Sequence, residues 1–336
     1  MTSATPATLG SLGESGVLAR IFPRLPAATG ELLGPGDDAA VLAAPDGRVV
    51  ITTDMMIHGP DFRLAWSSPH DLGWKAAASN LADIAAMGAV PTALVVAIAA
   101  PAETPVEVLE GIAEGLRDGC ATMAPGCGVV GGDLSVSATL TLAVTAFGDL
   151  EGRAPVTRSG ARLGDVVAVS GVLGAAAHGL RLLFERGVVD GEPDAGAAAA
   201  LALEHPAALA AQLAPRPPIA DGPAAALAGA TAMLDLSDGL AIDARRLATA
   251  SGVAVDLSSV AVAAGFPFDE PHDPRVALDG GEDHALLATF PPGAELPGWF
   301  RAIGAVVEGS GVLVDGTPYL ARSGWDPYEN WDGRAG

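Results

Sequence analysis

Residues 68–100 decide the fold of this chain, and they read SPHDLGWKAAASNLADIAAMGAVPTALVVAIAA. The segment opens with a serine, then a proline, and an acid three residues after the serine. This combination caps the free N–H groups of a first helical turn. Gly88 is typical of a helix end. We therefore predict a helix from Ser68 to Gly88 that carries Asp83, followed by a buried strand over residues 91–100.

The segments on either side of this helix and strand continue an α/β pattern. Before it, residues 39–42 and 49–53 are apolar or β-branched and flank a Pro-Asp-Gly turn, so they predict a β-hairpin. After it, residues 105–120 have the spacing of an amphipathic helix, and residues 128–132 and 140–147 predict two further strands. We therefore expect an α/β domain in the first half of the chain.

A polar stretch with glycine and proline interrupts this pattern near residue 150, and a second alternation follows. Its predicted elements are a strand over 166–170, a helix over 174–184, helical segments over 194–214 interrupted by Pro206, an extended connector over 215–218, a strand over 231–236, a helix over 240–250 and, after Gly252, a strand over 253–257. We expect an N-terminal segment at 1–33, a first domain at 34–150 and a second domain at 151–336.

Composition excludes several classes of protein. The chain has 336 residues, with 18 lysines and arginines against 40 aspartates and glutamates, so its formal net charge is −22. Such a charge opposes binding to nucleic acid or to an anionic membrane. The longest apolar run, residues 93–100, is well short of the roughly 20 residues of a membrane-spanning helix. We expect no secretory signal, a cytoplasmic protein, and reduced thiols at Cys120 and Cys127.

Acidic residues gather beside glycines and hydroxyl side chains at the ends of the predicted strands. The five groups are Gly36-Asp37-Asp38, Thr52-Thr53-Asp54, Gly131-Gly132-Asp133, Asp235-Leu236-Ser237-Asp238-Gly239 and Gly280-Gly281-Glu282-Asp283. One such group is common at a surface turn, but five together favour a ligand site. Mg²⁺ prefers carboxylate and hydroxyl oxygens and shares its coordination with phosphates. If the carboxylates converge, their repulsion raises their pKa values, and a cation relieves it.

The common lysine-dependent phosphate loop is absent from the sequence. Lys75 is the only lysine, and it does not follow a glycine-rich loop. A dinucleotide-type Gly-x-Gly-x-x-Gly pattern is also absent after the first strand. Phosphate can instead meet the backbone amides of Gly131 and Gly132, or those of the helix that follows residues 237–239. Arg158 can add a permanent charge, although a surface arginine explains it equally well.

In their order along the chain, these groups resemble the thiamine-monophosphate kinase family. The matching stretches are residues 36–42, 52–54, 75–76, 80–89, 131–133, 157–161, 235–240 and 280–283. The resemblance covers about residues 34–290. It implies the α/β and α+β fold of the aminoimidazole-ribonucleotide-synthetase superfamily, in which the N-terminal α/β domain forms the dimer sheet or barrel and an α+β domain follows. It also implies a homodimer that uses ATP and several Mg²⁺ ions to convert thiamine monophosphate to thiamine diphosphate.

The resemblance implies roles for individual residues. The metal ligands would be Asp38, Thr52, Thr53, Asp54, Asp83, Asp133, Asp235 and Asp238. The contacts with ATP would come from Gly132, Asp133, Arg158 and Ser237, and those with thiamine monophosphate from Asp61, Glu282 and Trp325. Asp54, Asp83 and Asp133 would act at the centre of the transfer. Many members of the family carry histidine at the position of Asp61, and no residue between 120 and 128 is assigned to adenine.

The implied reaction needs no general base, because the second pKa of a phosphate monoester lies near 6 and its oxygen is largely ionised at pH 7. We therefore expect direct in-line transfer assisted by Mg²⁺. One alternative is a relative similar to aminoimidazole-ribonucleotide synthetase, with the same use of ATP and metal on another substrate. Others are a nucleotide or metal sensor without turnover, and an acidic structural module. Selenophosphate synthetase would need a reactive cysteine near the N-terminus, which the sequence lacks.

Overall fold

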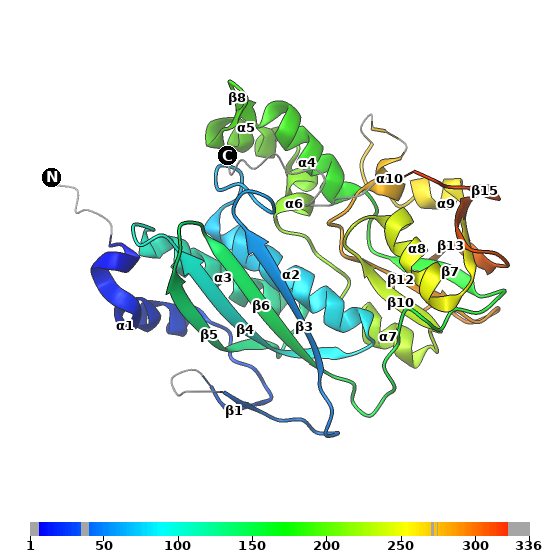
Figure 1. The fold of residues 1–336 in the computed structure, drawn as a ribbon, viewed down its shortest axis with the longest axis horizontal. Helices are drawn as coiled ribbons and strands as arrows, with labels where there is room; N and C mark the ends of the chain where they lie inside the picture. The colour runs from blue at the N-terminus through cyan, green and yellow to red at the C-terminus, as the bar shows by residue number, and fades with distance from the viewer. Residues whose placement is uncertain (1–6, 35–39, 270–271, 274, 322–336) are drawn as a thin grey trace.

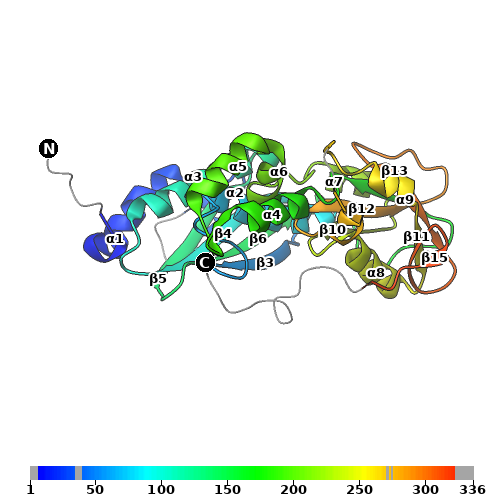
Figure 2. The same ribbon diagram turned by 90° about the horizontal axis from the view of Figure 1, so that it is seen from above.

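Two β-sheets share helix α2 (Pro69–Ala86) in the computed structural model, which describes residues 7–34, 40–269, 272–273 and 275–321. Figure 1 shows a smaller sheet in the N-terminal half beside a larger one in the C-terminal half, and Figure 2 shows that the molecule is elongated from one half to the other. Buried residues of α2 belong to one apolar cluster with Met233 and Phe290 of the larger sheet. Helix α2 is therefore part of the core of both halves.

The smaller sheet has the strand order β3-β6-β4-β5, with β4 and β5 parallel and the other pairs antiparallel. Its strands are β3 (Val50–Ile57), β4 (Val90–Ala100), β5 (Gly128–Val136) and β6 (Thr141–Asp149). Helix α3 (Val106–Met123) makes the crossover from β4 to β5, and α2 and α3 lie behind the sheet in Figure 1. Asp54 pairs with the buried Val144 and shares its face, which is the face covered by the helices. Thr53 and Met55 point to the opposite face.

The larger sheet has the strand order β10-β12-β7-β13-β11-β14-β15 and is mainly antiparallel. Its strands are β7 (Val166–Ser170), β10 (Ala232–Leu236), β11 (Ala254–Leu257), β12 (Ala285–Phe290), β13 (Arg301–Val307), β14 (Gly311–Val314) and β15 (Thr317–Pro318). Its helices are α4 (Ala175–Arg186), α5 (Ala195–Glu204), α6 (Pro206–Leu213), α7 (Asp221–Leu227), α8 (Leu240–Ser251), α9 (Ser259–Ala263) and α10 (Val276–Asp279). This arrangement places β10, which leads into the Asp235–Gly239 turn, against α2.

The predicted hairpin before α2 is wrong. Strand β2 (Val41–Leu42) pairs with β1 (Glu31–Leu33), whereas β3 pairs with β6. The turn itself forms, but the long β3–β6 ladder gives β3 many more partners than the two-residue β2 can offer. The remaining elements are α1 (Leu9–Ile21), η1 (Phe22–Arg24) and the short pair β8 (Val188–Val189) and β9 (Glu192–Pro193).

The helix predicted from residues 68–88 is confirmed in detail. The Ser68 side chain accepts from the Asp71 backbone N–H, and the Asp71 carboxylate accepts from the Ser68 backbone N–H, which completes the capping box. Gly88 follows the helix with a φ of 74°, a conformation that suits glycine. Among the described residues, none of the helices has the length and apolar character needed to cross a membrane.

Candidate active site

Three carboxylates face one another where α2, β3 and β10 meet. Asp83 lies on α2, Asp54 on β3 and Asp235 near the end of β10. The hydroxyl of Thr52 donates to Oδ2 of Asp83 at 2.8 Å, which fixes that carboxylate against β3. The structure therefore brings together four of the residues that the sequence analysis named as metal ligands, from three segments that are far apart in the chain.

The electrostatics of this cluster show that its carboxylates repel one another. Burial raises the pKa of Asp83 to about 7, and the charges of Asp235 and Asp54 add to the rise. Burial also raises the pKa of Asp54, with a further contribution from Asp235. Without a cation, the cluster holds more negative charge than its surroundings neutralise.

His284 is the partner of Asp235 that the sequence analysis missed. Its buried ring donates from Nδ1 to Oδ2 of Asp235 at 3.4 Å. Burial lowers the pKa of His284, but the hydrogen bond and the charge of Asp235 outweigh this, so its pKa is raised. The signal was its position directly after the quoted Gly280–Asp283 group.

The loop that carries His284 is held by backbone contacts to the Asp235–Gly239 turn. The N–H of Glu282 donates to Ser237 O at 2.8 Å, and that of His284 donates to Leu236 O at 3.0 Å. Both Glu282 and His284 have positive φ values, of 69° and 51°, which non-glycine residues rarely adopt. Their side chains are thus placed by a backbone conformation that the surrounding contacts maintain.

Asp283 anchors this loop to the start of α4. Its carboxylate accepts hydrogen bonds from the backbone N–H groups of Gly174 and Ala176. Burial raises the pKa of Asp283 to about 6, although those two hydrogen bonds act in the opposite direction. Asp283 is therefore a structural member of its group, whereas Glu282 and His284 face the site.

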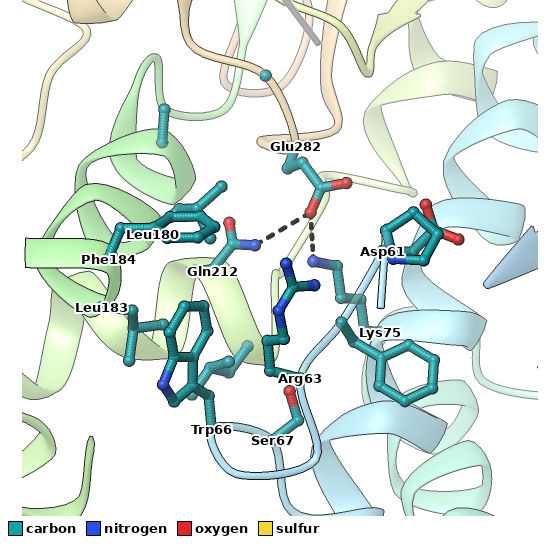
Figure 3. A pocket seen from close by; sticks show the side chains of 15 residues that line it. Asp61, Arg63, Trp66, Ser67, Lys75, Leu180, Leu183, Phe184, Gln212 and Glu282 are labelled. Atoms are coloured by element: carbon teal, nitrogen blue, oxygen red, sulfur yellow. Dashed lines mark hydrogen bonds and ion pairs between the residues drawn. The ribbon is translucent and has the colours of Figure 1, made fainter. Parts of the chain in front are cut away.

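A pocket of about 130 Å³ is lined by Glu282 (Figure 3). The Glu282 carboxylate acts on His284, the partner of Asp235, so this pocket adjoins the carboxylate cluster. It is formed by the loop after β3, by α2, α4 and α6, and by the loop at residues 281–282. On its apolar side, the rings of Trp66 and Phe184 pack edge to face with their centroids 5.0 Å apart. The guanidinium carbon of Arg63 lies 5.9 Å from the centroid of each ring. An aromatic wall beside charged groups suits a ring-containing ligand that also carries charge.

The polar side of this pocket contains Glu282 and Asp61, two of the predicted substrate residues. Lys75 forms an ion pair with Glu282, and Gln212 donates to the same carboxylate at 3.1 Å. Asp61 accepts from the N–H of Ile57 at 2.7 Å, and burial raises its pKa. The sequence analysis named Lys75 within a stretch that matches the family and as evidence against a phosphate loop, but gave it no role in the site. It missed Gln212, which lies in the predicted helical segments over residues 194–214.

The predicted nucleotide residues of the C-terminal half lie around α8. Asp238 pairs with Arg246 at 2.7 Å, and Arg246 also contacts Asp243 at 2.6 Å. Burial raises the pKa of Asp243 to about 6. Arg158 lines an open cavity that also includes Arg246. This cavity gathers positive charge in a strongly acidic chain, and Ser237 lies in the turn next to α8.

Several predicted residues are not brought to the cluster within one chain. Thr53 points to the opposite face of the sheet, where its hydroxyl donates to Val144 O. Asp133 and Gly132 lie on β5, at the edge of the sheet opposite β3, and are exposed to solvent. Asp38 and Trp325 lie outside the described residues.

The described part of the chain does not contain a complete metal cage of three or more histidine, cysteine or acidic residues. Asp54, Asp83 and Asp235 nevertheless fit Mg²⁺, because this ion usually takes only a few protein carboxylates and completes its shell with water and substrate phosphates. The raised pKa of Asp83 supports this fit, because burial and the charges of Asp235 and Asp54 cause it and a bound cation would relieve it.

Comparisons with known proteins agree on one group of relatives. Residues 36–150 match the model of "AIR synthase related protein, N-terminal domain". The chain is 44% identical to a thiamine-monophosphate kinase of Mycobacterium tuberculosis, over 96% of this chain and 93% of the relative. It is 33% identical to the Aquifex aeolicus enzyme of the same name, over 94% and 98% of the two chains.

Solved structures show the same likeness. The structure of AaThiL complexed with AMPPCP and TMP aligns with a TM-score of 0.72 at 31% identity, over 96% of this chain and 99% of that one. The hydrogenase maturation protein HypE in complex with ATP aligns with a TM-score of 0.65 over 92% of both chains. At 17% identity, HypE shows a shared fold alone.

Proposed function

This chain belongs to the thiamine-monophosphate kinase family, with the predicted fold of the aminoimidazole-ribonucleotide-synthetase superfamily, and we propose that it transfers the γ-phosphoryl group of ATP directly to thiamine monophosphate. The observation that carries this proposal is the position of the Asp54, Asp83 and Asp235 cluster beside an aromatic pocket with a charged end. A phosphorylated ring compound in that pocket can direct its phosphate toward the carboxylates. The AaThiL structure, which holds AMPPCP and TMP, supports both substrates.

Several Mg²⁺ ions would be held by Thr52, Asp54, Asp83 and Asp235, which meet in the structure, together with the predicted ligands Asp38, Asp133 and Asp238. Thr53, whose side chain points to the opposite face of the sheet, is left out of this set. When bound, the Mg²⁺ ions would neutralise the repulsion between the donor and acceptor phosphates. The chain's own contribution is to hold Asp83 against Thr52 and Asp235 against His284, so that the carboxylates are oriented before the substrates arrive.

The acceptor end of the site would bind thiamine monophosphate through Asp61, Glu282 and Trp325, with its rings beside Trp66 and Phe184. The phosphate monoester is already ionised at pH 7, so its oxygen can attack the γ-phosphorus in line without a base. The donor end would use Gly132, Asp133, Arg158 and Ser237 for ATP.

We also propose a homodimer, built on domains at residues 34–150 and 151–336. Helices cover one face of the β3-β6-β4-β5 sheet, whereas Ile51 and Met55 on the other face are 59% and 58% exposed. Exposed apolar side chains of this size on a sheet favour contact with another chain. Asp133 belongs to β5 of the same sheet, so a second copy bound to this sheet would also approach Asp133.

The proposal is tested by ADP release from purified protein with ATP and Mg²⁺ in the presence of different acceptors. We expect release with thiamine monophosphate but not with free thiamine. Release only with another phosphorylated acceptor would identify a relative similar to aminoimidazole-ribonucleotide synthetase. Thermal stabilisation by ATP and Mg²⁺ without ADP release would identify a nucleotide sensor.

A further inference from the structure

The carboxylate of Glu282 is held by two side chains from different helices. Lys75 on α2 and Gln212 on α6 both donate to the same oxygen, Oε2 (Figure 3). Lys75 is the only lysine of the chain, and its side chain is only 8% exposed. Gln212 is 5% exposed. Two buried donors thus fix one oxygen of a carboxylate at the end of the pocket.

Stability alone does not account for this arrangement. A buried ion pair loses much of its Coulomb energy to desolvation, and an apolar pair of similar volume is often as stable. Burying the only lysine of the chain at this position is therefore costly if the ion pair serves only to pack the interior. The pair is better explained by what it leaves available to a ligand.

Two acceptor atoms are left available at this end of the pocket. None of the hydrogen bonds recorded among the described residues ends on Oε1 of Glu282, and the buried Oε1 of Gln212 also lacks a partner within that part of the chain. Donation from Gln212 Nε2 to Glu282 determines which way the amide faces, because the reversed amide would set an oxygen against a carboxylate. A buried acceptor without a partner is costly unless a ligand supplies a donor.

We propose that Lys75 and Gln212 are positioning residues, which hold Glu282 so that its second oxygen accepts an N–H group from the ring portion of the acceptor, a portion that also carries a positive charge on its other ring. The proposal rests on the proposed function of the pocket as the acceptor site. It fits the aromatic wall of Trp66 and Phe184, since a charged heteroaromatic ring is stabilised both by ring faces and by a carboxylate.

The test is a mutant cycle with Lys75→Met, Glu282→Gln and the double variant, read by titration calorimetry of thiamine monophosphate without ATP and by steady-state kinetics. Either single change should raise the Kd and KM for thiamine monophosphate about 10- to 100-fold, the range for a lost charged hydrogen bond. The KM for ATP should change less than about threefold. Because Lys75 acts through Glu282, the double variant should be no worse than the worse single variant within about threefold.

Three further variants keep the test sharp if Lys75→Met folds poorly. Gln212→Met retains the ion pair and should raise the acceptor KM about 3- to 10-fold. Lys75→Arg keeps a cationic donor and should restore binding to within about fivefold of the wild type. Ser79→Ala is the matched control, because Ser79 lies one turn along α2, where its hydroxyl bonds to Lys75 O, and does not line the pocket.

The proposal is overturned if the Lys75 and Glu282 effects multiply in the double variant, if the KM values for both substrates rise equally, or if Lys75→Met binds the acceptor more tightly. The last result would mean that Lys75 merely screens Glu282 from a cationic ligand. These outcomes are distinct from failure of the proposed function, which a wild-type protein that forms no thiamine diphosphate would show.

Discussion

At the scale of single residues, the site is a set of carboxylates whose charges are only partly balanced by the chain itself. Asp83 shows this most clearly, because its pKa rises to about 7 through burial and through Asp235 and Asp54. His284 occupies one side of Asp235 through a hydrogen bond. A divalent cation would neutralise the remaining negative charge, and a polyphosphate would share the coordination of that cation.

We expect Asp54→Asn and Asp133→Asn each to abolish phosphoryl transfer, with kcat reduced roughly 100-fold or more, because each removes charge that would hold Mg²⁺ at the transferring phosphates. The measurement is the rate of ADP release with thiamine monophosphate. Circular dichroism should show an unchanged fold. Asp315→Asn, in the remote β14–β15 turn, is the control and should retain full activity. Near-normal rates in both site variants would disprove the metal assignment.

Metal-free stability should depend on pH through Asp83. Its pKa is raised from 3.8 to about 7 in the folded state, so between about pH 4 and pH 7 the folded chain keeps a proton that the unfolded chain has released. The free energy of unfolding therefore falls as pH rises through this window. Asp83→Asn removes this penalty, and we expect its Tm at pH 8 in EDTA to exceed that of the wild type by roughly 2 °C or more.

The control for this effect is Asp315→Asn. The hydrogen bond from Ser259 lowers the pKa of the Asp315 carboxyl, so replacing that carboxylate should not stabilise the fold. Scanning calorimetry from pH 4 to pH 8 gives the comparison. Adding Mg²⁺ should raise the Tm of the wild type and have much less effect on Asp83→Asn. An Asp83→Asn protein that is less stable than the wild type at pH 8 without metal would contradict the account.

The sequence predicted which residue types would form the site better than it predicted their partners. Asp54 and Asp235 stood out because acids beside glycines and hydroxyl side chains at strand ends are unusual together, whereas Asp83, on a helix, was assigned through the family resemblance. His284 and Lys75 gave no comparable signal, since one histidine after an acidic group or one lysine in a helix is ordinary. Their roles depend on contacts between segments about 50 and 200 residues apart in sequence, which no local pattern encodes.

At the scale of elements, α2 is placed by an unusually close crossing with α3. A Cβ on Gly73 would lie 2.0 Å from Ile112 O, and one on Gly115 would lie 2.0 Å from His70 O. Backbone therefore meets backbone at this crossing, where only glycine leaves room. The crossing sets the position of Asp83 and Lys75, which α2 carries.

Gly115→Ala should consequently destabilise the protein by roughly 2–4 kcal/mol, because a methyl group at a backbone contact forces the two helices apart. The matched control is Gly119→Ala on the same helix, where the new Cβ would meet the Ala77 methyl group at 3.3 Å. That change should cost less than about 1 kcal/mol. Urea unfolding monitored by circular dichroism measures both, and equal stabilities of the two variants would contradict the close crossing.

Local signals identified most elements but not their pairing. The capping residues and glycines around α2 and α8 marked the helix ends, and the structure confirms them. The pairing of β3 was wrong because a Pro-Asp-Gly turn predicts a hairpin locally, whereas β3 pairs with β6, which lies about 90 residues later. Helix α1 gave little signal because Gly13 interrupts it with a non-helical backbone.

At the scale of the whole molecule, the two sheets pack on α2 and bring β10 against the N-terminal half (Figure 1). This arrangement was expected from the family resemblance rather than from periodicity, because strand order in the seven-stranded sheet does not follow chain order. On the face of the smaller sheet away from the helices, Ala28, Ala40 and Leu42 pack against Phe147 and Val95, whereas Ile51 and Met55 stay exposed.

The proposed homodimer predicts that Met55→Glu converts the protein to a monomer, because a buried carboxylate at a sheet-to-sheet contact would be strongly unfavourable. Sedimentation velocity measures the change in mass. Val260→Glu is the control, since Val260 is 79% exposed on α9 in the other half of the molecule. A wild-type monomer, or a dimer that survives Met55→Glu, would contradict the proposed interface.

Phosphorylation of thiamine monophosphate by this chain is tested by mass-spectrometric analysis of the thiamine compounds formed with ATP and Mg²⁺. We predict thiamine diphosphate in equal amount to ADP, and none when EDTA replaces Mg²⁺ or free thiamine replaces the monophosphate. ADP formation without thiamine diphosphate, or unchanged thiamine monophosphate after complete incubation, would contradict the account.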